Sequence, residues 1–420
     1  MNPRTDTDPR ARGRRSLVFI LLTVGLDSLG LGILVPVIPR LILDLTGQGL
    51  TRAAVYGGWL VATFAAVQFL AGPILGSISD RVGRRPVLLS SLAAFGCSYI
   101  LMGLAPTLPW LFVAQVLTGL FGATPATAGA YIADISAATD RTRRFGATAA
   151  AYGTGLIVGP ALGGILVAQG TRLPFFVAAG LSLLTVIYGF VVLPESLPPE
   201  RRRKMSWQRA HPFGAMRLLS RAPGIASLFM VLLLQRTVMG TLPATWPYFT
   251  MQEYGWSARD VGYSLAGFGL ATVLSQVWLL RWVDARIGTV LTASVGLMLL
   301  ASGYLGLAVI KASWITALCI PLATMGFMAG PALVSVLSAR IGSDLQGTLQ
   351  GVVASLSGVA AVLTPLVMPH LFSVFSGYSG PMHLPGAPYL LGAVMALVGV
   401  MLIKRVVRLE SKELIPQEAS

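Results

Sequence analysis

Runs of about 20 apolar residues recur along the whole chain, and they constrain its fold more than any other feature. A helix rises about 1.5 Å per residue, so roughly 20 residues cross the 30 Å hydrocarbon core of a bilayer. Only 11% of the 420 residues are charged, whereas soluble proteins carry about 25%. We therefore predict an all-α membrane protein with twelve transmembrane helices. The predicted spans are 16–39, 55–78, 87–104, 109–134, 145–168, 173–193, 223–249, 258–280, 288–309, 313–338, 347–372 and 387–406.

Basic residues collect in alternate connections between these runs. Of the 31 Lys and Arg residues, 25 lie on one side if that side holds both tails and the even-numbered connections. Cytoplasmic loops of membrane proteins carry an excess of Lys and Arg, so this side is predicted to be the cytoplasm. Topology thus explains the net charge of +15, and we expect an inner (cytoplasmic) membrane protein, with no nucleic-acid partner.

A polar stretch at 194–222 divides the spans into six and six. Four residues of the first half recur in the second at an offset of 204 or 205, which indicates two pseudo-symmetric six-helix bundles, as in many transporters. The matched pairs are Gly146/Gly351, Gly153/Gly358, Pro160/Pro365 and Asp80/Asp284. The predicted divisions are a cytoplasmic tail (1–15), an N-terminal bundle (16–193), a cytoplasmic loop (194–222), a C-terminal bundle (223–406) and a cytoplasmic tail (407–420).

The sequence carries no pattern that indicates a cofactor or an enzyme. Its two cysteines lie inside apolar runs and its three histidines are scattered, so we expect no disulfide framework and no metal site. It lacks a Gly-x-x-x-x-Gly-Lys phosphate loop, and it lacks the clustered nucleophiles or paired carboxylates that membrane enzymes use.

Two charged residues lie deep within predicted helices. Asp27 is the only such acid and Arg236 the only such base. Charges at this depth cost several kcal/mol unless they face water, a ligand or each other, so they are functional candidates. We predict that Asp27 carries the coupling proton, and that Arg236 lines the substrate cavity and either tunes Asp27 or anchors an anionic substrate. The alternative is a structural ion pair between them.

Other polar and aromatic residues within the spans are candidates for the substrate cavity. The glutamines offer hydrogen bonds to a substrate, although they also suit helix–helix contacts. Aromatic residues near helix ends also serve as interfacial anchors. The candidates are Gln68, Gln115, Gln235, Gln276, Trp246 and Tyr248.

The connection after the second span, residues 76–86, combines basic residues with an acid and two glycines. Its functional candidates are Gly76, Asp80, Arg81, Gly83, Arg84 and Arg85. Gly76 permits close helix approach and Gly83 a tight turn. The segment resembles the loop signature of the major facilitator superfamily. That resemblance implies a cytoplasmic latch in which Asp80 and Arg84 join Asp134 and the N-terminus of the helix that starts near Gln346.

The fifth span contains a Gly-x-x-x-Gly-Pro-x-x-Gly-Gly pattern, formed by Gly155, Gly159, Pro160, Gly163 and Gly164. It is similar to the signature of the drug/proton antiporter branch of the superfamily, and this resemblance implies export. Proline bends a helix, and we expect the glycines to let this helix lie tight against its partner in the other half.

Several segments resemble the tetracycline efflux transporters, among them 26–30, 35–39, 122–124 and 263–267. That family carries acids in helices 3 and 9 and an arginine in helix 4, where this chain has Ser98, Leu297 and Gln115. We predict a monomeric, proton-coupled antiporter that exports a small amphipathic molecule, drug-like or endogenous, by alternating access, with a role in multidrug or tetracycline-like resistance. The alternatives are an exporter of a metabolite such as a siderophore, or a non-transporting receptor or scaffold.

Overall fold

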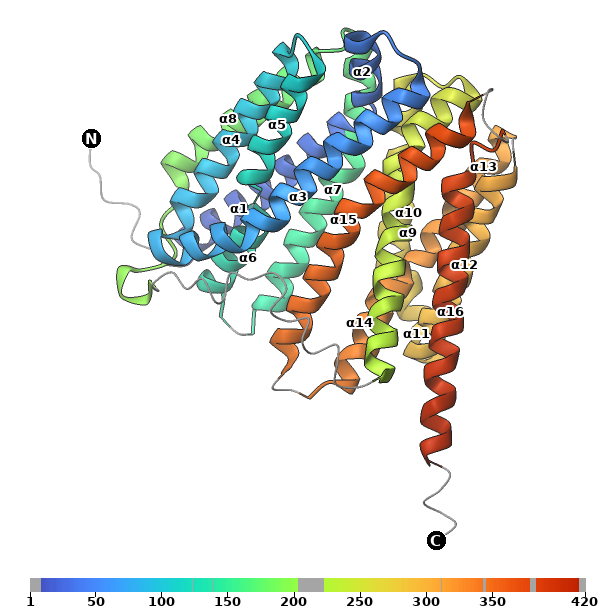
Figure 1. Cartoon of the computed structure of the whole chain (residues 1–420). Coiled ribbons are helices and arrows are strands. Elements are labelled where there is room, and N and C mark those ends of the chain that lie inside the picture. Colours follow the sequence, from blue (N-terminus) through green and yellow to red (C-terminus); the bar gives the residue numbers. More distant parts are fainter. Residues whose placement is uncertain are drawn as a thin grey trace, which may run out of the picture. The chain divides into compact units, whose positions relative to one another are not determined.

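The computed structural model describes residues 9–122, 124–137, 139–202, 223–310, 312–342, 345–377 and 383–414, so the predicted tails and central loop lie partly outside it. All regular elements in these ranges are helices (Figure 1). They are α1 (Pro9–Leu34), α2 (Ile38–Thr46), α3 (Leu50–Val82), α4 (Arg84–Leu104), α5 (Leu108–Leu120), α6 (Thr124–Ile135), α7 (Arg141–Val167), α8 (Leu173–Val192), α9 (Pro223–Tyr254), α10 (Ala258–Leu274), α11 (Leu280–Ile287), α12 (Thr289–Val309), α13 (Ser313–Met325), α14 (Ala329–Arg340), α15 (Gln346–Ser376) and α16 (Ala387–Leu414), with short 3₁₀ or π turns at Pro199–Arg201, Ser275–Leu279 and Gly326–Met328.

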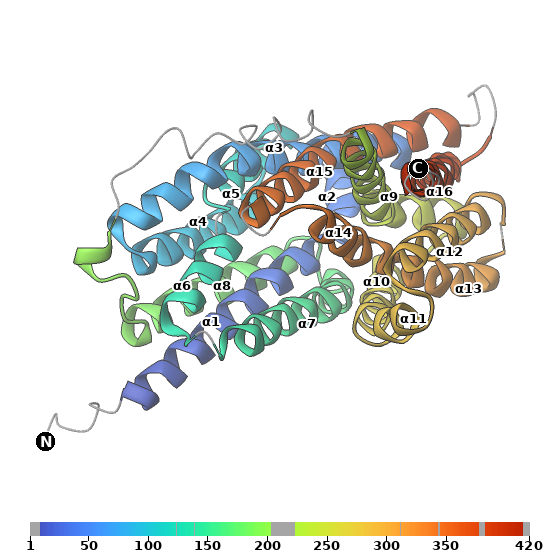
Figure 2. The same ribbon diagram turned by 90° about the horizontal axis from the view of Figure 1, so that it is seen from below.

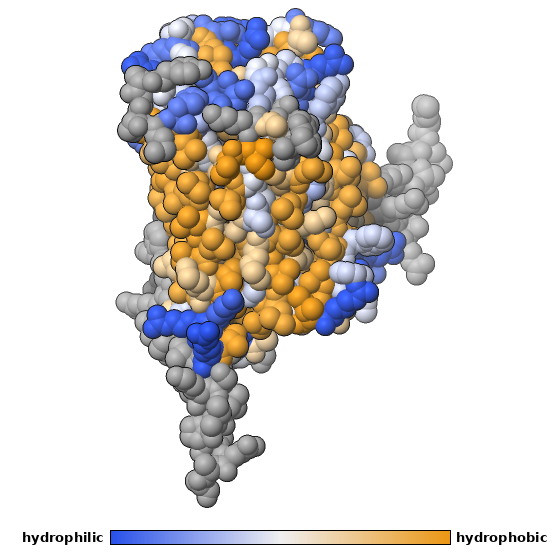
Figure 3. All heavy atoms as spheres, turned by 90° about the vertical axis from the view of Figure 1, so that its right-hand side faces the viewer, coloured by the Kyte–Doolittle hydropathy of each residue, from blue (hydrophilic) through white to orange (hydrophobic). Residues whose placement is uncertain are grey.

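The described residues form 12 helical spans that are long and apolar enough to cross a membrane. Figure 3 shows the corresponding surface, a broad apolar band with hydrophilic residues gathered at its two ends. The chain is therefore a multi-pass, all-α membrane protein, and the predicted fold class is confirmed.

The first predicted span, 16–39, is two helices in the structure. α1 ends at Leu34 and α2 begins at Ile38, after a turn over 35–37. Pro36 disfavours helical backbone at the residue before it. Pro39 fits the first turn of α2 because it lacks a backbone N–H, and the N–H groups of a first turn have no acceptor within the helix. The predicted end at residue 39 is therefore wrong.

Three further spans contain interruptions that hydropathy alone did not indicate. The fourth is divided into α5 and α6 around Gly122, the eighth contains the π-helical turn Ser275–Leu279, and the tenth contains a 3₁₀ turn at Gly326–Met328. Such turns inside long helices often occur at functional sites, because they change the direction of nearby side chains. Gln276, one of the cavity candidates, belongs to the π turn.

One compact unit of the chain comprises residues 1–47, 63–211 and 257–266. α1 packs against α7 and α8, and α4 packs against α5, α6 and α8. Its core joins apolar side chains of α1, α4 and α6, including Phe19, Leu88 and Tyr131, none of which is exposed. This unit holds Asp27 and the charged loop at 76–86.

The other compact unit comprises residues 48–62, 212–256 and 267–420. Its core is built from α9, α12, α14, α15 and α16 and includes Phe229, Leu297, Leu333 and Val400. Within it, α14 contacts both α9 and α15 (Figure 2). This unit holds Arg236 and Gln276.

Two local features recur in the two units at a spacing of 204 or 205 residues. Gly83 (φ 121°) and Gly288 (φ 77°) directly precede α4 and α12, in a backbone region that favours glycine. Within the first unit, a Cβ added to Gly262 would contact the carbonyl oxygen of Pro160; within the second, one added to Gly58 would contact that of Pro365. Both features support the internal duplication that the sequence indicated.

Candidate functional site

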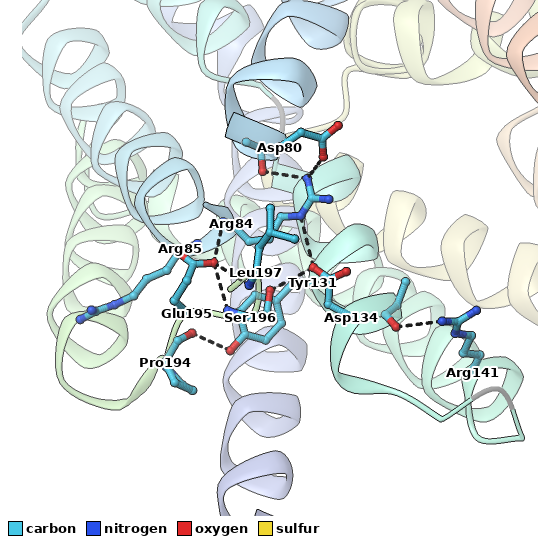
Figure 4. Close-up of polar contacts among 12 residues, drawn as sticks. Asp80, Arg84, Arg85, Tyr131, Asp134, Arg141, Pro194, Glu195, Ser196 and Leu197 are labelled. Atoms are coloured by element: carbon cyan, nitrogen blue, oxygen red, sulfur yellow. Dashed lines mark hydrogen bonds and ion pairs between the residues drawn. The ribbon is translucent and has the colours of Figure 1, made fainter. Parts of the chain in front are cut away.

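Three charged side chains meet where α3, α4 and α6 come together. Nη1 of Arg84 lies 2.6 Å from Oδ1 of Asp80, and Nε of Arg84 donates to Oδ2 of Asp134 at 3.4 Å (Figure 4). The Arg84 side chain is only 13% exposed, so this guanidinium is well shielded from solvent. The structure thus brings together the three residues that the resemblance assigned to a latch. α15 belongs to the other unit, and its part in the latch stays a prediction.

Gly83 is the turn between α3 and α4, and its positive φ is difficult for any other residue. A Cβ at this position would also collide with the carboxylate of Glu195. By contrast, within its own unit no described atom lies within 4 Å of a Cβ built on Gly76, so the expected close approach there is not seen. Arg81 is exposed.

Glu195 was not among the sequence candidates, yet it organises this site. Its Oε1 accepts the backbone N–H of Arg84 at 2.8 Å, and its Oε2 accepts that of Arg85 at 3.2 Å. These are the first two N–H groups of α4, which have no partner inside the helix. Oε1 also accepts the N–H groups of Ser196 and Leu197 at 3.0 Å each. The only sequence signal was its position as an acid directly after the sixth span.

Further contacts hold the segment that carries Glu195. The Tyr131 hydroxyl of α6 donates to the carbonyl of Pro194 at 2.8 Å, and Ser196 Oγ donates to Asp134 at 3.2 Å. Arg85 donates to the carbonyl of Phe190 at 2.6 Å, and its guanidinium lies 5.4 Å from the centre of that ring. The ends of α3, α6 and α8 and the start of α4 therefore form one polar network (Figure 4).

The glycines of α7 pack against α1 of the same unit. A Cβ built on Gly159 would lie 2.6 Å from the carbonyl oxygen of Leu29 and 2.8 Å from the Cα of Gly32. Gly155 and Gly163 meet the carbonyl oxygens of Gly25 and Ile33 in the same way. We expected these glycines to face a helix of the other half of the sequence. For these three the expectation is wrong, because small residues on both α1 and α7 let the two backbones touch.

The remaining residues of the α7 pattern contact α10. A Cβ on Gly164 would lie 2.8 Å from the carbonyl oxygen of Ala258, and the Pro160 carbonyl faces Gly262. Both α10 residues come from the second half of the sequence, although they belong to the same compact unit. The pattern therefore has two faces, one on α1 and one on α10.

Asp27 is 5% exposed on α1, and among the described residues its Oδ1 has no hydrogen-bond partner. The side chains of Tyr99 on α4 and Tyr152 on α7 lie near this carboxyl group. Gly30 leaves room for the Tyr99 hydroxyl, which would lie 2.9 Å from a Cβ at that position. Asp27 thus stands among three helices of its unit. Arg236 lies in the other unit, so their partnership stays a prediction.

Arg236 and Gln276 line one cavity of about 590 Å³ in the second unit. The π turn of the eighth span presents Gln276, and α9 presents Arg236. The Nε of Arg236 is buried and has no hydrogen-bond partner among the described residues. The structure therefore places two of the predicted cavity residues, Arg236 and Gln276, on one cavity, and the Nε of the arginine has no partner among the described residues.

The sequence as a whole matches a known family. The model of the Major Facilitator Superfamily matches residues 20–365 and also 228–419. The chain belongs to this superfamily.

Its relatives within the superfamily include resistance proteins. The class C tetracycline resistance protein of Escherichia coli is 34% identical over 394 residues, which cover 94% of this chain and 98% of that protein. Multidrug resistance protein 1 of Bacillus subtilis is 28% identical over 92% of this chain and 95% of that protein. The solved structure of the nucleoside transporter NupG matches with a TM-score of 0.74 at 12% identity, over 94% of this chain and 99% of that one, and shows the same fold. This superfamily member is a transporter and not an enzyme, as predicted.

The other glutamines predicted for the cavity of this transporter have different surroundings. Gln68 donates to the carbonyl of Gly122 at 2.8 Å, which joins the second and fourth spans. Gln235 is fully buried beside Gly330, with its Nε2 3.7 Å from the sulfur of Met239 and its Oε1 without a partner among the described residues. Gln115 is half-buried on α5. Their contact with a substrate stays a prediction.

Trp246 and Tyr248 lie in the packed end of α9. Trp246 is 1% exposed and stacks 6.1 Å from Phe249, within a cluster of aromatic rings. Tyr248 is 4% exposed, and its hydroxyl fills the space beside Gly57. In the second unit both residues have packing contacts, and neither lines the cavity that holds Arg236. Their predicted role in substrate binding is not tested by these contacts.

Proposed function

We propose that this transporter is a proton-coupled exporter of small amphipathic molecules, that it acts as a monomer in the cytoplasmic membrane, and that both of its tails lie in the cytoplasm. Asp27 carries the coupling proton, and the two halves of the sequence alternate access to the substrate. The names of the relatives, which refer to tetracycline and multidrug resistance, favour export over uptake.

The observation that carries this proposal is the state of Asp27. A buried carboxyl group with an oxygen that lacks a hydrogen bond is costly when it is ionised. Such a group is retained in a membrane helix when its gain and loss of a proton serve a function. Asp27 also lies on α1, which packs against the glycines of α7, and a difference in this packing between inward- and outward-facing states would change its access to water.

The polar network around Arg84 supports alternating access. Salt bridges that tie helix ends together can stabilise one of two arrangements and break in the other. Arg84 binds acids from two different spans, and Asp80 remains 45% exposed, so the pair is accessible to a competing partner. A receptor or scaffold that does not move has no need of an ion pair that can exchange partners.

The residues that replace the charges of the tetracycline exporters favour a different substrate. Ser98 is fully buried with its Oγ unpartnered among the described residues, and Leu297 is 1% exposed in the core of the second unit. A core leucine cannot replace a carboxylate that binds a substrate or a cation. Export of another drug-like compound or of an endogenous metabolite therefore fits the chain better than export of tetracycline.

Everted membrane vesicles with an imposed pH gradient test the proposal. Tetracycline, ethidium and 2-naphthoate are added as zwitterionic, cationic and anionic probes, and proton release is followed with a pH-sensitive dye. At least one probe is expected to evoke proton release in the wild type. Asp27→Asn is expected to abolish this release and uphill transport while retaining some downhill exchange, because a neutral amide mimics only one protonation state.

Asp44→Asn is the matched control, since Asp44 is an exposed acid on α2. It is expected to release protons as the wild type does. Unchanged proton release in folded Asp27→Asn protein would contradict the coupling role of Asp27. A wild type that moves none of the probes and releases no protons would favour a receptor or scaffold.

A further inference from the structure

The cavity of the second unit is lined by polar groups that include one positive charge and no negative charge. Its polar groups are Arg236, Gln276, Ser335, Ser338 and Gln350, and none of its lining residues is acidic. Apolar side chains such as Met239, Phe327 and Val334 form the rest of the wall. A cavity of about 590 Å³ is the size that holds a drug-sized ligand. The cavity therefore offers one positive charge, neutral hydrogen-bonding groups and an apolar surface.

The arginine in this cavity is partly buried, and its buried Nε lacks a hydrogen-bond partner among the described residues. No described carboxylate of its unit forms an ion pair with it. A guanidinium only donates hydrogen bonds and remains charged, so its needs can be met only by an acceptor, best of all an anion. Retaining such a group near the middle of a membrane helix is expensive unless water or a ligand completes it, and an anionic ligand does so with the strongest hydrogen bonds.

One of the polar residues of the cavity, Ser338, is held in place by hydrogen bonds at the end of α14. Ser338 Oγ donates to Oε1 of Gln346 at 2.9 Å, and Nε2 of Gln346 donates to the carbonyl oxygens of Ser338 and Ile341 at 2.9 and 3.1 Å. These bonds fix the end of α14 against the start of α15. From Gly330 to Ser338 the cavity follows α14 for about 12 Å, given a rise of 1.5 Å per residue. The polar lining thus leads from the helix ends toward Arg236.

We propose that this cavity binds the anionic group of the transported compound, and that the substrates are amphipathic organic anions whose carboxylate, or a group of similar shape, pairs with Arg236. The amides of Gln276 and Gln350 and the hydroxyl of Ser335 complete the anion site, while the apolar wall accommodates an aromatic or aliphatic body. This inference rests on the proposed export function and names its substrate class.

Equilibrium binding to the full-length protein in lipid nanodiscs tests the inference without transport or a pH gradient. Titration calorimetry compares 2-naphthoate with 2-naphthamide, indole-3-acetate with indole-3-acetamide, and diphenylacetate with diphenylacetamide. Each pair keeps the apolar body and changes only the charge. At least one acid is expected to bind about tenfold or more tightly than its amide, since hydrogen bonds to charged groups contribute about twice as much as neutral ones.

Variants of the cavity show whether Arg236 is the cause. Arg236→Gln is expected to weaken binding of the acid by about 10- to 100-fold and to change binding of the amide little. Arg236→Lys should be intermediate, because lysine keeps the charge but lacks the planar fork. Gln350→Glu is nearly isosteric and places a carboxylate in the cavity, so it should also weaken acid binding selectively. Arg281→Gln is the control, as Arg281 is exposed and outside this cavity.

Two outcomes would overturn the inference. One is that no acid in the panel binds more tightly than its amide; the other is that folded Arg236→Gln and Gln350→Glu proteins keep the wild-type preference. Gln350→Glu keeps the test decisive if Arg236→Gln does not fold. Because no proton movement is measured, failure here leaves the role of Asp27 standing, and failure of the proton-release experiment leaves anion binding standing.

Discussion

Removal of the Glu195 side chain tests whether this acid organises the polar network. In Glu195→Ala, α4 loses the acceptor of its first two N–H groups, and Ser196 and Leu197 lose theirs. A capping acceptor contributes about 0.5–2 kcal/mol, and a negative charge at a helix N-terminus adds about 0.3–1 kcal/mol. Water can replace part of these hydrogen bonds at a half-buried residue. We therefore expect the free energy of unfolding to fall by about 2 kcal/mol, which lowers Tm by roughly 4–8 °C for a unit of this size.

The two carboxylate oxygens of Glu195 bind different N–H groups, so a variant that keeps one of them should be destabilised less than Glu195→Ala. Glu195→Gln can keep Oε1 with its three N–H donors, but it places an NH₂ group against the N–H of Arg85 and removes the charge. Its Tm should therefore fall between that of the wild type and that of Glu195→Ala. Gly83→Ala should be at least as damaging as Glu195→Ala, since it strains the backbone and displaces the Glu195 carboxylate.

Thermal unfolding of purified protein in one detergent, followed by size-exclusion chromatography, measures the effect. Glu200→Ala is the control, because Glu200 is an exposed acid five residues further along the chain. If Glu195→Ala melts at the same temperature as Glu200→Ala, then the four hydrogen bonds contribute nothing and the reasoning is refuted.

Two further variants test the latch and the contact between α1 and α7. Asp80→Asn removes the charge 2.6 Å from Arg84 and should lower transport of whichever probe the wild type carries by about tenfold or more, without loss of folded protein. Asp140→Asn, which breaks the ion pair of the exposed Asp140 with Arg144, should leave transport unchanged. Equal transport rates for the two variants would contradict the latch. Gly159→Ala should destabilise the protein by about 1–3 kcal/mol, because backbone atoms of α1 surround the new Cβ. Gly146→Ala, with nothing within 4 Å of its Cβ, should be neutral or stabilising, and equal Tm values for the two variants would contradict a tight contact between α1 and α7.

The three side chains of the predicted latch were named from the sequence because residues 76–86 resemble the loop signature of the superfamily, which also implies a role for Asp134. Asp80 and Arg84 lie four positions apart across one turn, and Asp134 ends a predicted span. Glu195 could not be placed in the same way. It is 111 residues from Arg84 along the chain, and only the packing of α8 against α4 brings the two together. The helix that Gly155, Gly159 and Gly163 of α7 contact was also mispredicted, because glycine has no side chain that specifies a partner.

The sequence by itself determined the number of membrane spans, the all-α fold and the presence of one acid and one base deep within them. These properties follow from the composition of each segment, since a run of about 20 apolar residues is long enough to cross a bilayer as a helix, which satisfies all its own backbone hydrogen bonds. The tertiary structure alone decided which residues meet. It set Asp27 among the tyrosines of α4 and α7, joined Gln68 to Gly122, and gathered Arg236 and Gln276 around one cavity. Hydropathy is a local property of a helix, whereas a binding site depends on which helix faces pack together.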